Sequence, residues 1–186
     1  VNEPMDFFTT AGAKKIFKNR LRYIVSRWGY STNLAVYELF SETDETGEDK
    51  LTGTSEWETN PGYRNATAAW HLEMADFIRN TLKEKTHLLS TSFAGCPDYT
   101  GGICKVEDID PNLTTSVYTS SLFDITSRHW YDGRKNANLL NRYNNAYYNL
   151  HQYPIKPFIF GELGAEPESV ESCTDITYHN SAWSTA

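Results

Sequence analysis

The stretch Ala35-Val36-Tyr37-Glu38-Leu39-Phe40-Ser41-Glu42 begins as a short apolar run and ends at an acidic residue. A short apolar run that ends at polar residues is typical of a buried parallel strand. We therefore expect a strand over 33–40, with Glu42 at the point where the strand gives way to a loop. A second run of the same design, Pro157-Phe158-Ile159-Phe160-Gly161-Glu162-Leu163-Gly164, lies 120 positions further on (162 − 42) and places Glu162 at the end of another strand.

Helices and short apolar strands alternate along the rest of the chain. In chain order, hydrophobic spacing predicts a loop over 1–10, a helix over 11–28, the strand over 33–40, a helix over 66–82, strands over 87–93 and 122–127, a helix over 136–150 and a strand over 158–160. This alternation predicts a parallel sheet, and α/β folds place their sites at the carboxyl ends of such strands. No glycine-rich phosphate loop follows an expected strand, so nucleotide binding has no support.

Composition and charge fit one ordinary folded domain. The chain has 186 residues, of which 39% are apolar and 14% aromatic, and its formal net charge is −7. An acidic chain does not favour nucleic acid or anionic membranes as partners, since both attract basic patches. No apolar run approaches the roughly 18–20 residues that span a bilayer, so we expect no membrane insertion. The start at Val1 lacks the features of a signal peptide, and a first residue that is Val rather than Met indicates a processed chain or a fragment.

The three cysteines leave two interpretations open. Cys96 and Cys104 flank a short turn-rich stretch, and Cys173 lies far along the chain. The first two either form a small-loop disulfide, which would imply an exported protein, or remain unpaired thiols in a loop. No His/Cys spacing matches a zinc pattern, so the sequence predicts neither a metal site nor a cofactor.

Three segments resemble a known enzyme family. The run Leu21-Arg22-Tyr23-Ile24-Val25-Ser26-Arg27-Trp28-Gly29-Tyr30, followed by residues 37–42, looks like the fourth βα segment of clan A glycoside hydrolases. It is closest to the family 5-like (β/α)8 barrels of bacterial polysaccharide degraders. The run Phe160-Gly161-Glu162-Leu163-Gly164 is similar to the end of their seventh strand, and His129-Trp130-Tyr131 matches the His-x-Tyr that often ends the sixth.

This resemblance implies a fold and a mechanism. The fold would be α/β, a (β/α)8 TIM-type barrel of which residues 1–186 form a single partial domain covering about strands four to seven. The rest of a longer chain, or an assembly partner, would complete it. The reaction would be retaining hydrolysis of a β-linked polysaccharide or oligosaccharide by double displacement, with Glu42 as general acid/base and Glu162 as nucleophile. A secreted, cell-surface or periplasmic location is expected with that substrate.

The same resemblance gives roles to four further residues. Tyr131 would hydrogen-bond the nucleophile, and His129 would line the pocket as a hydrogen-bonded histidine. Trp130 either stacks on a sugar face or packs in the core. Ser41 stands where the family has an Asn that contacts the sugar 2-hydroxyl, and the shorter side chain weakens that contact.

Two alternatives to this enzyme stay open. A non-catalytic carbohydrate-binding or structural protein that retains the barrel fits Ser41 and the missing strands. An unrelated α/β hydrolase has less support, because the chain has no G-x-S-x-G elbow.

Overall fold

The computed structural model describes residues 3–49, 54–55, 60–93, 117–131 and 156–164. Its elements are α1 (Pro4–Thr9), α2 (Ala11–Trp28), β1 (Val36–Glu38), the 3-10 helix η1 (Thr43–Glu45), β2 (Glu48–Asp49), β3 (Thr54–Ser55), α4 (Pro61–Asp76), the π-helical segment η2 (Phe77–Thr81), β4 (Leu88–Ser90), β5 (Ser92–Phe93), β6 (Thr126–Tyr131) and β7 (Phe158–Gly164).

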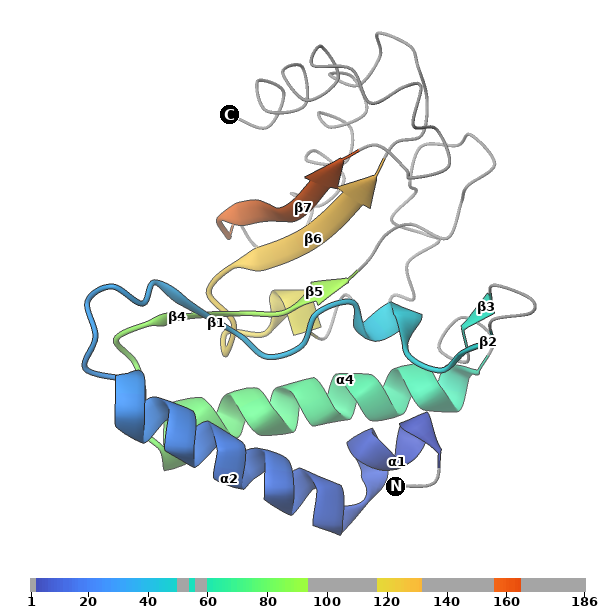
Figure 1. The fold of residues 1–186 in the computed structure, drawn as a ribbon, viewed down its shortest axis with the longest axis horizontal. Coiled ribbons are helices and arrows are strands. Elements are labelled where there is room, and N and C mark those ends of the chain that lie inside the picture. The colour runs from blue at the N-terminus through green and yellow to red at the C-terminus, as the bar shows by residue number, and fades with distance from the viewer. Residues whose placement is uncertain (1–2, 50–53, 56–59, 94–116, 132–155, 165–186) are drawn as a thin grey trace, which may run out of the picture.

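The strands that carry the predicted site pair in parallel. β1 pairs with β4, and β5, β6 and β7 form a three-stranded sheet in that order. Only Thr91 separates β4 from β5, so these two strands follow one line (Figure 1). Bonds from Leu39 N to Ser90 O (2.9 Å) and from Ser92 N to Phe40 O (3.1 Å) extend the pairing of β1 toward Glu42. The spatial order of the parallel segments thus follows the chain order, as the alternation of helices and strands predicts.

The helices α1, α2 and α4 lie on one side of β1 and β4 (Figure 1). α2 has the bounds expected from its apolar spacing, and the side chain of Thr10 caps it by accepting from Ala13 N at 3.4 Å. Lys14 and Lys18 of α2 pair with Glu73 of α4 at 2.8 and 2.6 Å, which ties the two helices together.

An aromatic cluster fills the space between these helices and the end of β1. The indole of Trp70 is fully buried, with ring centroids of Phe17, Phe8 and Phe40 at 4.8, 5.5 and 5.9 Å. Burying an aromatic side chain contributes about 1.5–3 kcal/mol. Phe40 lies two positions before Glu42, so the core fixes the segment that presents this carboxylate.

The predicted loop over residues 1–10 is wrong, because α1 occupies residues Pro4–Thr9. Six residues are too few to show a helical period, and such a short helix depends on tertiary packing. Phe8 supplies that packing, since its side chain is buried in the aromatic cluster.

The predicted start of the second helix is also wrong by five positions. α4 begins at Pro61, and the Asn60 side chain caps it by accepting from Gly62 N at 2.9 Å. A proline at the first helical position needs no N–H partner, so Asn-Pro starts this helix before its apolar spacing begins.

Other differences lie at the ends of strands. The polar loop expected after Glu42 contains η1, and β2 pairs antiparallel with β3. β6 both begins and ends four positions later than predicted, and β7 ends four positions later than predicted. His129 and Glu162 therefore lie within strands. The predicted helix over 136–150 and the cysteine pair lie outside the described residues. Among the described helices, none has the length and apolar character that crossing a bilayer requires.

Candidate active site

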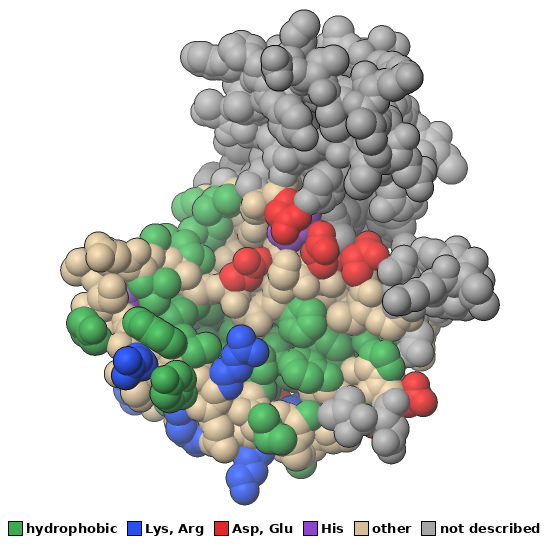
Figure 2. Space-filling view, in the orientation of Figure 1, with side chains coloured by type: hydrophobic (Ala, Val, Ile, Leu, Met, Phe, Trp, Pro, Cys, Tyr) green, Lys and Arg blue, Asp and Glu red, His purple; other side chains and the backbone are tan. Residues whose placement is uncertain are grey.

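Glu42, His129 and Glu162 meet at the carboxyl ends of the parallel strands. The His129 Nδ1 atom lies 2.8 Å from Glu42 Oε1 and 3.7 Å from Glu162 Oε1. One oxygen of each carboxylate and one ring nitrogen of the imidazole all lie within 4.8 Å of one another. Figure 2 shows acidic side chains gathered around a histidine on this face of the molecule. The structure thus brings together two carboxylates that lie 120 positions apart in sequence (162 − 42).

Glu42 has a left-handed backbone conformation, with φ 54° and ψ 53°. This conformation costs roughly 1–2 kcal/mol for a residue with a β-carbon, and such strain gathers at functional sites. It turns the chain sharply between the end of β1 and η1. The Glu42 side chain is 35% exposed, so its carboxylate contacts both His129 and solvent.

A bulge in β7 brings His129 against Glu162. Arg128 is in register with Phe160, whereas His129 is in register with Glu162, so Gly161 is the extra residue. A β-carbon on Gly161 would lie 3.1 Å from both Cδ2 and Nε2 of His129. A side chain at position 161 would therefore push the imidazole away from β7 by a few tenths of an ångström. The side chain of His129 is 3% exposed, and that of Glu162 is 48% exposed.

A buried polar network lies behind Glu42. The His71 Nδ1 atom lies 2.7 Å from the Thr67 carbonyl, so Nδ1 carries the hydrogen and Nε2 is the acceptor in the neutral ring. The hydroxyls of Thr91 and Thr43 lie 2.9 and 3.3 Å from Nε2. Burial lowers the pKa of His71 to about 4, although the bond to Thr67 opposes this shift. This neutral imidazole anchors Thr43, the residue that follows Glu42.

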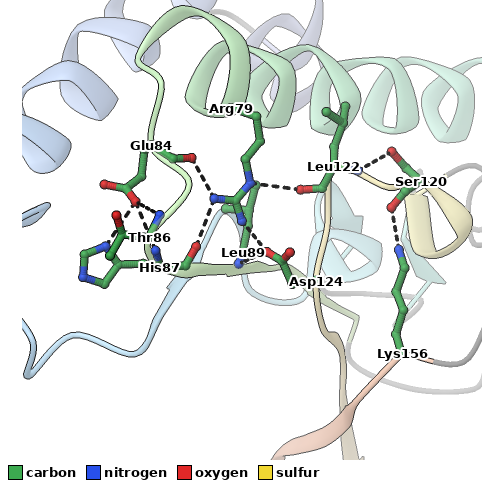
Figure 3. A network of polar contacts seen from close by, with 9 residues as sticks. All are labelled: Arg79, Glu84, Thr86, His87, Leu89, Ser120, Leu122, Asp124 and Lys156. Atoms are coloured by element: carbon green, nitrogen blue, oxygen red, sulfur yellow. Dashed lines mark hydrogen bonds and ion pairs between the residues drawn. The ribbon is translucent and has the colours of Figure 1, made fainter.

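A second network holds the opposite ends of the strands. Arg79, in η2, donates to the carbonyls of Glu84 (2.8 Å) and His87 (2.9 Å) and forms an ion pair with Asp124 (Figure 3). Asp124 also accepts from Leu89 N at 2.8 Å. The guanidinium thus joins the chain before β4 to the chain before β6 and fixes their relative position.

Glu84 and His87 belong to the same network and lie just before the start of β4. Glu84 Oε1 accepts from the backbone N–H of Thr86 at 2.7 Å and from that of His87 at 3.0 Å. Burial by itself would raise the pKa of the Glu84 carboxyl, but these N–H groups and the imidazole of His87 lower that pKa below its usual value. The carbonyl of Ser31, 2.9 Å from Nε2, raises the pKa of His87, and Glu84 adds to this effect.

The structure places the four residues with predicted substrate contacts in different surroundings, and it describes the side chains of two of them. His129 is the buried, hydrogen-bonded histidine that was expected, and it contacts both carboxylates. Ser41 is exposed between Phe40 and Glu42. Trp130 and Tyr131 continue β6, in register with Leu163 and Gly164, but their side chains lie outside the described part of the structure.

Sequence reasoning missed three residues that shape this site. A glycine inside an apolar strand signals a bulge, and this signal was present at Gly161. His71 and Thr43 gave no comparable signal, because a histidine on an apolar helix face looks the same whether or not it supports a loop. The contact between them joins residues 28 positions apart.

The donor set of the site permits two kinds of chemistry. A pair of carboxylates at this separation can act as acid/base and nucleophile at one anomeric carbon. The two carboxylates and the imidazole nitrogen are also ligands that a divalent metal ion accepts. The chain matches no protein-family model and no curated protein, and its structure matches no solved structure.

Proposed function

We propose that this chain is the part of a retaining β-glycoside hydrolase that carries both catalytic carboxylates. The separation of Glu42 and Glu162 carries the proposal, because one oxygen of each lies within 4.8 Å of the other. Retaining pairs lie about 5–5.5 Å apart, whereas inverting pairs leave about 6.5–9.5 Å for a water molecule.

The order of the strands supports the barrel that this family implies. The described parallel segments follow one another in space in chain order, with β1 first and β7 last. A (β/α)8 barrel has this order, whereas a doubly wound sheet reverses its order at the site. The two carboxylates also lie at the carboxyl ends of the strands, where barrel enzymes have their active sites.

The proposed reaction has two displacements. Glu162 attacks the anomeric carbon as a carboxylate while Glu42 gives its proton to the leaving oxygen, and a glycosyl ester forms on Glu162. Glu42 then takes a proton from water, which attacks the same carbon, and the bond to Glu162 breaks. His129, held against Gly161, donates its Nδ1 hydrogen to Glu42 whenever Glu42 is ionised and keeps that carboxylate facing Glu162.

Hydrolysis of a panel of β-linked glycans by the full chain tests this proposal. We expect Glu42→Ala and Glu162→Ala each to lower the rate of reducing-end release at least about 100-fold. The matched control is Glu38→Ala, since Glu38 is an exposed carboxylate at the end of β1, four positions before Glu42, and its rate should stay at the wild-type value. Unchanged hydrolysis by Glu162→Ala would overturn the assignment.

Azide separates the two roles, because every displacement inverts the anomeric carbon. In Glu162→Ala, azide takes the place of the nucleophile and should give an α-glycosyl azide after one inversion. In Glu42→Ala, azide attacks the glycosyl ester and should give a β-glycosyl azide after two inversions. The opposite pattern of products would exchange the roles of the two residues.

Non-catalytic carbohydrate binding is the second candidate, and Ser41 favours it. Ser41 stands where the resembled family has Asn, and its shorter side chain weakens a contact that strengthens in the transition state. If the hydrolase proposal holds, Ser41→Asn should raise the rate of hydrolysis, while Ser41→Ala should not. Glycan binding by the wild-type chain without any release of reducing ends would replace the hydrolase by this candidate.

A further inference from the structure

We infer that Glu42, His129 and Glu162 also form a binding site for a zinc-class divalent ion, and that the bound ion blocks the proposed hydrolysis. The inference deepens the proposed function, because the inhibition rests on the catalytic roles of the two carboxylates. The ion binding itself rests only on the arrangement of the three side chains.

The separations within the cluster suit a tetrahedral ion. Zinc bonds of about 2.0–2.2 Å to oxygen and nitrogen place neighbouring ligand atoms roughly 3.3 Å apart. The distances from His129 Nδ1 to Glu42 Oε1 and Glu162 Oε1 are 2.8 and 3.7 Å, on either side of that value. The widest separation among the three ligand atoms is no more than 4.8 Å. The Glu162 side chain is 48% exposed, so it has room to rotate toward the ion.

Two of the ligands are already held in place. The imidazole of His129 is 3% exposed and lies against Gly161, where no β-carbon could fit without displacing it. Glu42 is fixed by the turn at its left-handed backbone and by the buried contact of Thr43 with His71. Such preorganisation lowers the conformational entropy lost when the ion binds.

The donor types select the class of ion. The Nδ1 atom of His129, once the ring hydrogen has moved to Nε2, and two carboxylate oxygens suit Zn²⁺, which takes mixed nitrogen and oxygen ligands. Mg²⁺ and Ca²⁺ prefer oxygen ligands throughout and higher coordination numbers, so they should bind more weakly here. Three protein ligands leave a fourth position of the ion for water or a ligand oxygen.

An ion at this position should inhibit the proposed hydrolysis, because it binds the two residues that carry out the reaction. An ion bonded to both carboxylates withdraws the acid/base and the nucleophile at once, so the sugar and the ion compete for the same space.

The sequence predicted no metal site, because spacing along the chain does not reveal ligands that lie 87 and 33 positions apart (129 − 42 and 162 − 129).

Calorimetric titration of the metal-free full chain with Zn²⁺ tests the binding. We expect one Zn²⁺ per chain, at least about 10-fold weaker binding in His129→Gln and in Glu162→Gln, and unchanged binding in Glu38→Gln. Glu162→Gln changes a partly exposed side chain, so it remains informative if His129→Gln does not fold. The absence of stoichiometric binding, or equal binding by wild type and Glu162→Gln, would overturn the inference.

A second measurement separates this inference from the proposed function. Zn²⁺ should inhibit glycan hydrolysis competitively, and an equal concentration of Mg²⁺ should not. Stoichiometric Zn²⁺ binding by a chain that hydrolyses no glycan would refute the hydrolase and leave the ion site standing. Hydrolysis that Zn²⁺ does not inhibit, by a chain that does not bind Zn²⁺, would refute the ion site and leave the hydrolase standing.

Discussion

His129 lies against the backbone of Gly161, the residue directly before Glu162. The space that a β-carbon on Gly161 would occupy lies 3.1 Å from two atoms of the imidazole and 3.0 Å from Ser127 Oγ. A bulge in β7 and a buried ring in β6 thus fit together, and this fit holds the imidazole of His129 beside Glu162.

Replacing Gly161 by alanine should damage the site more than the fold. The added methyl group meets a buried imidazole that has little room to move, so His129 should shift away from Glu42 and Glu162. We expect glycan hydrolysis to fall by about 10–100-fold, the scale for losing a group that orients a reacting side chain. The free energy of unfolding should fall by about 1–3 kcal/mol, as overpacking of a well-filled region does.

Gly12→Ala is the matched control for this substitution. No atom lies within 4 Å of a β-carbon built on Gly12, which is in the first turn of α2. Hydrolysis by Gly12→Ala should equal that of the wild type. Equal rates for Gly161→Ala and Gly12→Ala would show that the contact between Gly161 and His129 does not matter to the site.

At position 42, glycine should give a more stable protein than alanine, which is the reverse of the usual order. Glycine normally destabilises a protein relative to alanine, because it loses more backbone entropy on folding. The left-handed backbone of Glu42 reverses this, so Glu42→Gly should be about 1 kcal/mol more stable than Glu42→Ala by urea unfolding. Both variants should lack hydrolysis, which would show that the strained residue is kept for its carboxylate.

Lys83 and Ser41 provide the two controls for that comparison. Lys83 is exposed and has φ 60°, so Lys83→Gly should also be more stable than Lys83→Ala, with hydrolysis unchanged. Ser41 is exposed without a positive φ, so alanine should be the more stable choice there. Alanine more stable than glycine at position 42 would contradict the strain assigned to Glu42.

The parts of the fold that sequence predicts well are those with local causes. α2 begins and ends at the expected residues because its apolar spacing and its cap at Thr10 are both local signals. The aligned carboxyl ends of β1 and β7 follow from the apolar runs before Glu42 and Glu162. α1 was missed because Phe8 is stabilised by residues from distant helices.

The geometry of the site has causes that no local pattern contains. No pattern in the sequence marks the left-handed turn at Glu42, and Gly161 signals a bulge but not the imidazole that lies against it. The anchoring of Thr43 depends on His71, which is contributed by another element. Sequence could therefore name Glu42, His129 and Glu162, but the contacts of the imidazole with both carboxylates and the support from His71 required the three-dimensional arrangement.

Arg79 should matter to stability and not to the site. Arg79→Met leaves the carbonyls of Glu84 and His87 without this donor and the Asp124 carboxylate without its ion pair. We expect a loss of about 1–3 kcal/mol in the free energy of unfolding, the scale for leaving buried acceptors without a donor, while the Asp124 side chain is 38% exposed and stays solvated. Urea unfolding measures this loss, and hydrolysis per folded molecule should stay unchanged, because Arg79 lies at the opposite ends of the strands.

Arg27→Met is the matched control for Arg79→Met. Arg27 is exposed on α2, and its guanidinium lies 6.0 Å from the ring centroid of Trp28. Exposed substitutions of this kind usually change stability by about 0.5 kcal/mol or less. If both variants lose a similar free energy of unfolding, the hydrogen bonds and the ion pair of Arg79 do not stabilise the protein more than an exposed arginine does.

The pH dependence of stability should reveal the buried neutral histidine. Burial lowers the pKa of His71 to about 4 in the folded chain, whereas the ordinary value, expected in the unfolded chain, is 6.5. Between these values the unfolded chain binds more protons, so stability rises with pH through this window and is lost as the pH falls. A shift of this size corresponds to about 3 kcal/mol between pH 6.5 and pH 4.

His71→Asn and His87→Asn separate the histidines by the sign of their effects. Asparagine does not titrate, so His71→Asn should lose less stability than the wild type when the pH falls from 6.5 to 5. His87 has a raised pKa, so its contribution is full below pH 6.5 and is lost as the pH rises through the folded value. Urea unfolding should therefore show a shallower acid loss below pH 6.5 in His71→Asn, whereas His87→Asn should lose less stability than the wild type as the pH rises above 6.5. The same acid slope in His71→Asn and in the wild type would mean that the ring behind Thr43 is not held neutral in the folded chain.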